Sequence, residues 1–227
     1  MSATKRLLAI DPTLKIHNEG EWGGTVSEYS AFNDAGLEAE VGEFMYGLIR
    51  VLKPDRVLET GTHIGVGASY MGLALQDNDK GVLDTIEFLP ELHKQAVERI
   101  KKMGLEYNVN LYLQDVKDFK PQHAYKFILL DTEPQTRFAE FIKFFPHLEE
   151  GGFIFIHDLH NHMCQGNINP DHPEIKSWPF GTIPSALEEL VVGGKVSVFH
   201  LPTPRGLFGV YKTHSKDYNW IDKTVKP

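Results

Sequence analysis

Glycines and carboxylates follow the short apolar runs of this 227-residue sequence. Glu59 ends the run Val57–Leu58, and glycines follow at positions 61, 65 and 67 before a segment, 68–75, that predicts a helix. Because glycine has no Cβ and tolerates positive φ, a strand, glycine turn and helix in this order allow backbone N–H groups to approach a ligand closely. The spacing is not the G-x-G-x-x-G of dinucleotide sites, and no Lys-Ser/Thr pair follows to make a phosphate-binding loop.

Acidic residues also end the later apolar runs. The runs 82–86, 109–113, 127–130 and 153–156 lead into Glu87, Asp115, Asp131 and the pair His157-Asp158. In an open α/β sheet, ligands bind at the carboxyl ends of the strands, where the strand order reverses. An acid at the position of Glu87, 20 residues after Gly67, can accept hydrogen bonds from both hydroxyls of a ribose, and Asp115 is placed to meet an adenine amino group. One acid at a strand end is common because strand ends meet water, but several beside a glycine loop favour a nucleoside site.

Alternating helices and strands would position these residues. Apolar residues at three- and four-residue steps predict helices over 37–53, 90–104, 138–145 and 183–192. Continuous apolar runs between the helices predict a parallel sheet that is buried on both faces. Two later runs, 196–201 and 207–211, predict an antiparallel hairpin.

Composition limits the classes of partner. The charged fraction of 24% and the hydrophobic fraction of 41% are ordinary for a globular protein, and the length fits one large domain. The formal charge of -8 without a basic patch argues against a nucleic-acid partner. The single cysteine, Cys164, excludes an internal disulfide framework. No apolar run is long enough to cross a membrane or to act as a signal peptide, so we expect a cytoplasmic protein. The sequence does not decide whether the protein forms a homo-oligomer.

The sequence from Leu37 to Tyr211 resembles the class I S-adenosylmethionine (SAM) dependent methyltransferases, above all the small-molecule O-methyltransferases of the catechol, caffeoyl-CoA and macrocin type. The motifs that carry the resemblance are 58–65, 85–87, Leu130-Asp131 and 151–158. It implies an α/β, Rossmann-like, doubly wound sheet of five parallel strands closed by an antiparallel C-terminal hairpin. The implied strand order is 3-2-1-4-5-7-6, with helices on both faces.

The resemblance also implies a cofactor, SAM, and the residues that bind it. Glycine-loop residues would surround the methionine part, Glu87 the ribose and Asp115 the adenine. The complete predicted set is Glu59, Gly61, Thr62, Gly65, Gly67, Glu87, Asp115 and Asp131.

Metal-dependent members of this group hold a divalent cation between acids that follow strands four and five, and Asp131 and Asp158 match those positions. Paired carboxylates suit Mg²⁺, which would orient a substrate hydroxyl and lower its pKa. This sequence departs from the pattern twice: Leu159 stands in place of an Asn or Asp ligand, and Pro134 in place of a basic lysine. His160 is the nearest substitute as third ligand, so the predicted metal set is Asp131, Asp158 and His160.

The sequence likewise leaves the identity of the general base undecided. The predicted catalytic residues are Asp158, His160 and His157, and His162 is a further candidate. Histidine can act as a base near neutral pH, whereas a histidine ligand would favour a softer ion than Mg²⁺. Without a metal, His160 or His157 would be the base and Asp158 would orient its imidazole.

We therefore predict an O-methyltransferase that acts on a hydroxyl of a small molecule such as a sugar, a phenol or another natural product. The alternatives are a metal-independent N-methyltransferase and a non-catalytic SAM-binding module. Residues 159–182, rich in Asn, His, Pro and Gly, would form part of the acceptor pocket, with Trp178 and Phe180 as its walls.

The predicted domain organisation has three parts. Residues 1–34 form an N-terminal arm with one short helix, 35–213 the methyltransferase domain and 214–227 a C-terminal tail. Trp22, Tyr29 and Phe32 of the arm either pack on the surface of the domain or form a substrate lid.

Overall fold

The computed structural model describes residues 1–19, 29–32, 37–133, 136–158, 187, 190–201, 203 and 205–214. Its elements in chain order are α1 (Ala3–Ile10), β1 (Ile16–Glu19), β2 (Tyr29–Phe32), α2 (Ala39–Leu52), β3 (Arg56–Thr60), α3 (Val66–Asp77), β4 (Val82–Glu87), α4 (Pro90–Lys102), β5 (Val109–Leu113), β6 (Tyr125–Leu130), α5 (Arg137–Phe144), the 3-10 turn η1 (Phe145–His147), β7 (Leu148–His157), β8 (Val196–Leu201) and β9 (Leu207–Lys212).

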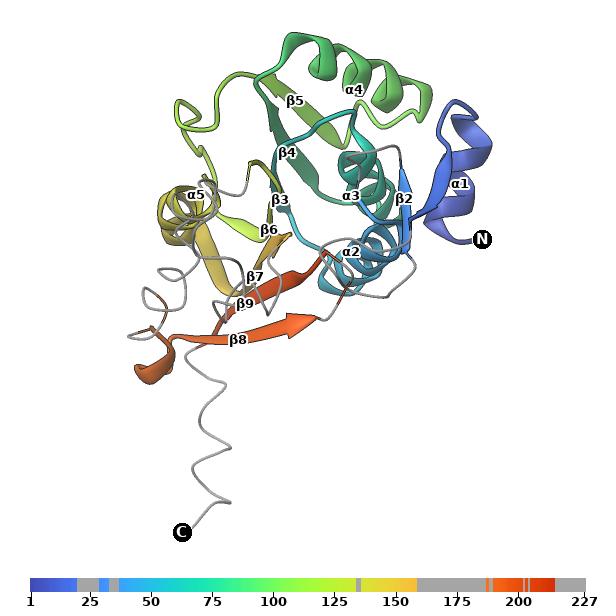
Figure 1. The fold of residues 1–227 in the computed structure, drawn as a ribbon. Helices are drawn as coiled ribbons and strands as arrows, with labels where there is room; N and C mark the ends of the chain where they lie inside the picture. The colour runs from blue at the N-terminus through green and yellow to red at the C-terminus, as the bar shows by residue number, and fades with distance from the viewer. Residues whose placement is uncertain are drawn as a thin grey trace, which may run out of the picture.

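Seven strands form one twisted sheet in the order β5-β4-β3-β6-β7-β9-β8 (Figure 1). The first five are parallel, and β9 pairs antiparallel with both β7 and β8. Numbered along the chain within this sheet, the order is 3-2-1-4-5-7-6, which confirms the predicted fold. The order reverses between β3 and β6, so the carboxyl ends of these two strands flank the place where doubly wound folds bind their ligands.

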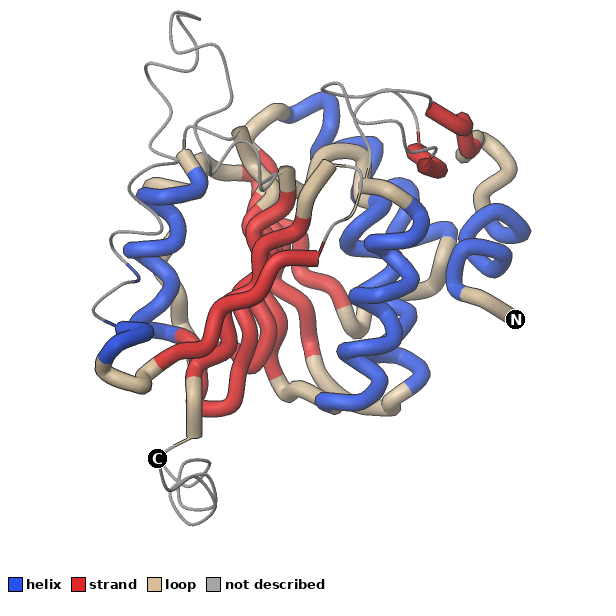
Figure 2. Tube along the Cα trace, turned by 60° about the horizontal axis from the view of Figure 1, so that its bottom comes forward, coloured by secondary structure: helices blue, strands red, loops and turns tan. Residues whose placement is uncertain are grey.

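Helices cover the two faces of the sheet (Figure 2). The pleat decides which side chains meet which layer, because successive residues of a strand point to opposite faces. In β6, Phe127 and Leu129 join the core shared with α1 to α4, whereas Ile128 and Leu130 join the core beneath α5. Both sets are fully buried. This burial on both faces explains why the sequence of β6 is a continuous run of apolar residues.

The N-terminal residues are more structured than the predicted arm. They form α1 and a two-stranded antiparallel sheet of β1 and β2, and the side chains of Leu7 and Phe32 are fully buried. The described contacts therefore place Phe32 in the core, whereas Trp22 lies outside the described residues. The buried carboxylate of Asp11 binds Arg99 Nε at 3.1 Å.

The β7 strand begins earlier than the predicted run 153–156, at Leu148. Its first residues pair with β6 across a register shift between Tyr125 and Phe127. Of the predicted helix 183–192, residues 187 and 190–192 are helical and the others lie outside the described part of the chain. Among the helices that the structure describes, none is both long enough and apolar enough to cross a membrane.

Candidate active site

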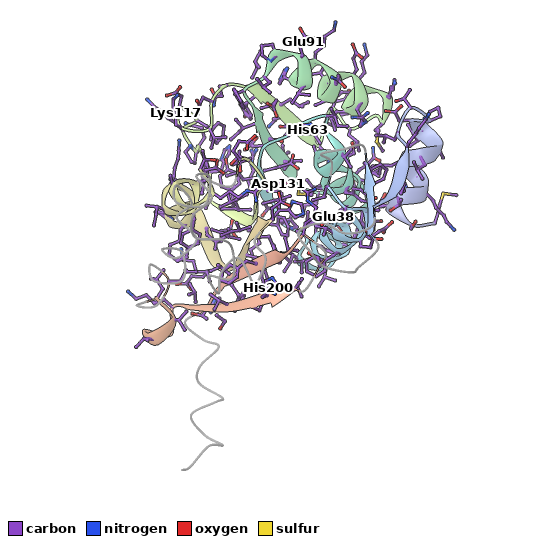
Figure 3. All side chains as sticks on the ribbon, in the orientation of Figure 1. Glu38, His63, Glu91, Lys117, Asp131 and His200 are labelled. Carbon is purple, nitrogen blue, oxygen red and sulfur yellow. The ribbon has the colours of Figure 1, made fainter. Side chains whose placement is uncertain are left out.

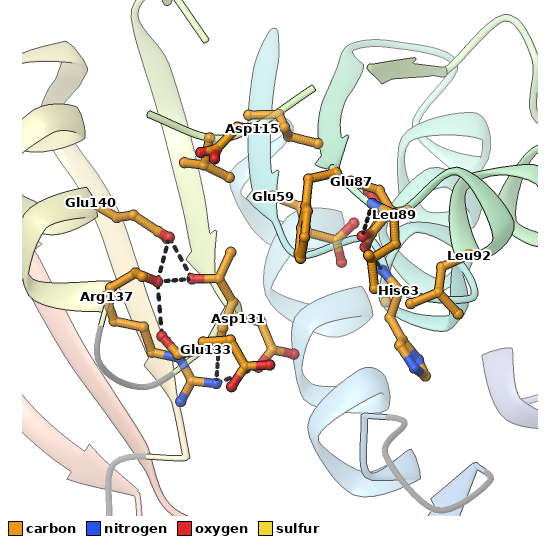
Figure 4. Close-up of a pocket in the computed structure, with 18 of the residues that line it drawn as sticks. Glu59, His63, Glu87, Leu89, Leu92, Asp115, Asp131, Glu133, Arg137 and Glu140 are labelled. Atoms are coloured by element: carbon orange, nitrogen blue, oxygen red, sulfur yellow. Dashed lines mark hydrogen bonds and ion pairs between the residues drawn. The ribbon is translucent and has the colours of Figure 1, made fainter. Parts of the chain in front are cut away.

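A cavity of about 840 Å³ opens at the carboxyl ends of the parallel strands (Figure 4). Eight of the residues predicted to bind a ligand line it: Glu59, Gly61, Thr62, Gly67, Glu87, Asp115, Asp131 and Asp158. Its volume lies within the range of small-molecule and cofactor sites, roughly 300–1,000 Å³. The predicted residues Gly65 and His157 do not line the cavity, and His160 lies outside the described residues.

The three glycines of the loop have different roles. Gly61 has a φ of +80°, and a Cβ there would lie 2.3 Å from the backbone oxygen of Asp131. Gly67 faces the cavity, and a Cβ there would lie 2.3 Å from Glu59 Oε1. Gly65 instead packs against α4, because its Cβ would lie 3.0 Å from the Cα of Ala96. Gly65 therefore allows α3 and α4 to approach, and its predicted cofactor contact stays a prediction.

Glu59 lies on the floor of the cavity. Thr85 Oγ1 donates to its carboxylate at 2.5 Å, and Thr62 Oγ1 lies 2.5 Å from Thr85 Oγ1. Burial raises the pKa of Glu59 well above its usual range, and the nearby charges of Asp131 and Glu87 act in the same direction. A cation bound in the cavity would favour the ionised form of this carboxyl group.

Glu87, at the end of β4, is held by the backbone. Its carboxylate accepts one hydrogen bond from the N–H of His63 at 2.8 Å and one from the N–H of Leu89 at 2.9 Å. A carboxylate offers about four lone-pair positions, so two remain for a ligand. His63 has a φ of +50°, a left-handed conformation that is uncommon for this residue type. The turn thus fixes Glu87 in a position where vicinal hydroxyls could bind.

The loop after β5 forms another wall of the cavity. The Asp115 carboxylate accepts a hydrogen bond from the backbone N–H of Lys117 at 2.9 Å and forms an ion pair with the Lys117 ammonium at 2.8 Å. Lys143 of α5 donates to the backbone oxygens of Val116 and Lys117, at 2.7 Å each. The loop is thereby attached to α5, beside the apolar wall formed by Phe88, Leu89 and Leu92.

A buried histidine joins three elements behind the cavity. The ring of His157 is fully buried, with Nδ1 2.8 Å from Asp131 Oδ1 and Nε2 2.6 Å from Glu38 Oε2. Glu38 immediately precedes α2, and Figure 3 shows it near Asp131 at the centre of the molecule. Burial alone would lower the pKa of His157, but the carboxylates of Asp131, Asp158 and Glu38 raise it to about 10. His157 is therefore an imidazolium with both nitrogens bonded, set back from the cavity.

Two arginines complete this charged cluster. Arg137 Nη2 lies 3.3 Å from Asp131 Oδ1 and 3.0 Å from Asp158 Oδ2. Arg205, in the β8–β9 turn, places Nε 2.7 Å from Asp158 Oδ1 and Nη2 2.9 Å from Oδ2. Burial would raise the pKa of Asp158, but His157 and the two guanidinium groups hold it well below its usual range.

Known proteins show the same architecture. Residues 58–159 match the family model Methyltransf_24, described as a methyltransferase domain. A caffeoyl-CoA O-methyltransferase from Stellaria longipes is 21% identical over 183 residues, which cover 76% of this chain and 74% of that protein. A protein-L-isoaspartate O-methyltransferase from Fervidobacterium nodosum is 37% identical over 70 residues, 31% of this chain and 34% of that protein. These matches make residues 58–159 similar to a methyltransferase domain, and they support a class I SAM-dependent methyltransferase of the O-methyltransferase type.

Solved structures support the same fold. The O-methyltransferase TomG from Streptomyces achromogenes, in complex with SAM, superposes with a TM-score of 0.65 at 18% identity, over 80% of this chain and 83% of that chain. An O-methyltransferase from Bacillus cereus in complex with SAH gives a TM-score of 0.65 at 18% identity, over 79% and 84%. The chain thus shares the fold of both neighbours.

The donor atoms of this cluster fit a divalent cation poorly. Asp131, His157 and Asp158 each place one N or O atom within 4.8 Å of the others, so the distances alone would permit a shared ion. Asp158 Oδ2, however, accepts hydrogen bonds from both guanidinium groups, Oδ1 forms an ion pair with Arg205, and Asp131 Oδ1 binds Arg137 and His157. A metal ligand must be free of such partners and deprotonated, and His157 has both nitrogens occupied.

Sequence reasoning missed Glu38, Arg137 and Arg205. Arg137 begins α5 six residues after Asp131, and an arginine beside an apolar helical stripe was a usable signal for a buried ion pair. Arg205 stands in a proline-rich turn, where a charge usually faces solvent. Glu38 precedes the first helix of the domain, and nothing in its local sequence indicates a partner 119 residues away.

Proposed function

We propose that this methyltransferase transfers the methyl group of SAM to a hydroxyl of a small molecule, and that Asp131 accepts the hydrogen of that hydroxyl. The observation that carries the proposal is the asymmetry of the Asp131 carboxylate. Oδ1 is bound by Arg137 and His157, whereas no described residue donates to Oδ2. The Asp131 side chain is 19% exposed and lines the cavity, so Oδ2 is available to a ligand.

SAM would occupy the part of the cavity that is lined by the glycine loop and Glu87. SAM, when bound, supplies an electrophilic methyl group. Glu87 offers two lone-pair positions for the ribose hydroxyls, Gly61 and Gly67 line the cavity where the methionine part is expected, and Asp115 lines it where the adenine is expected. These are the predicted roles, supported by the positions of the residues around one cavity.

The protein's contribution to the reaction is positioning and proton acceptance. The acceptor oxygen attacks the methyl carbon, the bond from that carbon to sulfur breaks, and the hydroxyl proton goes to Asp131 Oδ2. A positioned general base contributes about 10²–10⁴-fold to such a step. His157, which does not line the cavity, would act by holding Asp131, and Asp158 by holding the arginines. His160 remains a candidate base in the segment 159–182, predicted with Trp178 and Phe180 to complete the acceptor pocket.

The cavity favours a neutral, hydroxyl-bearing acceptor. Near Asp131 it is lined by polar side chains, including those of Thr132, Glu133, Thr136 and Glu140. Carboxylates outnumber ammonium and guanidinium groups along its wall, which disfavours an anionic acceptor. A sugar, a phenol or another natural product fits this chemistry. We retain a cytoplasmic location and a homo-oligomer as parts of the proposal.

An acceptor screen tests this function. Purified protein and SAM are incubated with phenols, sugars and amines, and S-adenosylhomocysteine is measured by mass spectrometry. We expect product only with hydroxylated acceptors. Asp131→Asn should lower kcat by about 10²–10⁴-fold while the Kd for SAM changes less than threefold. Glu133→Gln, on the same rim, is the matched control. Turnover with amines alone, or an unimpaired Asp131→Asn enzyme, would contradict the proposal.

A further inference from the structure

Two guanidinium groups surround the carboxylate of Asp158. Arg205 Nη2 and Arg137 Nη2 both donate to Oδ2, at 2.9 and 3.0 Å, and Arg205 Nε forms an ion pair with Oδ1 at 2.7 Å. Charge-assisted hydrogen bonds of this kind are about twice as strong as those between neutral groups. Asp158 itself has a φ of +54°, so the backbone is turned to present its carboxylate to the two guanidinium groups.

Arg137 is fixed by the backbone as well as by the acids. Its guanidinium donates to the backbone oxygens of Thr132 and His157, which follow β6 and end β7. Its side chain is 3% exposed. One planar group therefore holds the ends of two neighbouring strands together, at the place where the family resemblance puts a divalent cation.

The charges balance without a metal. Asp131 and Asp158 carry two negative charges, and Arg137 and Arg205 two positive ones, all within contact distance. Behind them, Glu38 faces His157. A divalent cation among these groups would lie beside two guanidinium groups that already neutralise both carboxylates.

We propose that Arg137 and Arg205 replace the divalent cation of the metal-dependent relatives, and that Arg137 is the positioning residue that directs Asp131 Oδ2 into the cavity. The second part rests on the proposed function, because it assigns Arg137 a role through Asp131. The first part concerns metal binding and stands independently of any turnover. The enzyme is then a metal-independent O-methyltransferase on a framework shared with metal-dependent ones.

Metal binding tests the first part directly. Mn²⁺ is titrated into the full-length protein and followed by electron paramagnetic resonance. We expect no saturable binding to the wild type at micromolar Mn²⁺. The variants Arg137→Gln and Arg205→Gln free carboxylate oxygens and should bind Mn²⁺ at least tenfold more tightly. Arg6→Gln, which breaks an exposed ion pair with Asp77, is the control for the loss of one positive charge. One Mn²⁺ bound per wild-type chain and lost in Asp158→Asn would overturn the proposal, even if neither arginine variant folds.

Chemical rescue tests the second part. Arg137→Ala should lower kcat at least 100-fold with the Kd for SAM nearly unchanged, and added methylguanidine should restore at least a tenth of the lost rate. Wild-type turnover should be unaffected by excess chelator. Loss of turnover in chelator, or lack of rescue in a variant that still folds and binds SAM, would refute the positioning role. Failure of the wild type to bind SAM would instead refute the proposed function and leave the Mn²⁺ result intact.

Discussion

Replacing Glu87 by glutamine should weaken SAM binding without disturbing the fold of the glycine loop. The carboxylate is 5% exposed and already accepts backbone hydrogen bonds from His63 and Leu89, so its orientation does not depend on a ligand. Glutamine keeps the size of the side chain but replaces one acceptor oxygen with an NH₂ group. That group must then face either a backbone N–H or the ribose.

The magnitude follows from this count of acceptors. A hydrogen bond to a charged group contributes about 1.5–3 kcal/mol. One such bond to a ribose hydroxyl therefore corresponds to about a 10- to 150-fold increase in Kd. Glu87→Ala removes the acceptors for both hydroxyls and should fall at or beyond the upper end of this range. Its two orphaned backbone N–H groups can be reached by water from the cavity.

Isothermal titration calorimetry with SAM and with S-adenosylhomocysteine measures the effect. Glu91→Gln, an exposed acid in the first turn of α4, is the matched control and should bind like the wild type. Circular dichroism at each pH and temperature used would establish that the variants are folded. A Kd for Glu87→Gln within twofold of the wild-type value would refute the ribose assignment.

Three further predictions concern stability. Gly67→Ala places a Cβ 2.3 Å from Glu59 Oε1 and should destabilise the protein by about 1–3 kcal/mol in urea unfolding. Gly47→Ala in α2, with no atom within 4 Å of the new Cβ, should stabilise it by about 0.5–1 kcal/mol. Equal effects of the two substitutions on the free energy of unfolding would contradict the packing argument. Arg99→Gln leaves buried Asp11 with Lys102 as its remaining described cation and should cost about 3–5 kcal/mol. Arg6→Gln should cost about 1 kcal/mol or less. The pKa of His157 is raised to about 10, so its stabilising contribution is complete below pH 6.5 and is lost as the pH rises through 10. The free energy of unfolding of the wild type should therefore fall between pH 7 and 10. If a His157→Gln variant shows the same pH dependence, another group titrates.

Local sequence information identified most of the residues that line the glycine-loop side of the cavity. Glu59 and Glu87 end their strands, and the glycine turn follows the first of them, so one short stretch specifies both the fold of the loop and the acid beside it. Gly65 has a structural role that this reasoning did not predict. Its spacing is that of a ligand-binding glycine, but the structure uses its missing Cβ for the approach of Ala96. Spacing alone does not reveal which neighbour a glycine makes room for.

The acceptor side depends on contacts that no local pattern carries. His157 and Asp158 were identified from the end of β7, but their environment comes from Glu38 and Arg205, which lie 119 and 47 residues away along the chain. A histidine beside an aspartate predicts a base or a ligand when read alone. In the structure, two carboxylates bind the ring of His157, and two guanidinium groups bind Asp158. These partners change the chemistry expected of both residues, and they are brought together only by the packing of five segments of the chain. His160 and His162 lie outside the described residues, so their roles stay predictions.

The same long-range contacts couple catalysis to folding. Each charge of the cluster is neutralised by a residue from another element: the start of α2, the ends of β6 and β7, the start of α5 and the β8–β9 turn. Leaving any one of these charges unpaired in the interior is costly, so the cluster favours the arrangement in which all five segments are docked. That arrangement leaves Asp131 Oδ2 as the carboxylate oxygen facing the cavity without a described donor. Positioning of the reactive atom and closure of the sheet by the C-terminal hairpin are therefore two consequences of one set of ion pairs.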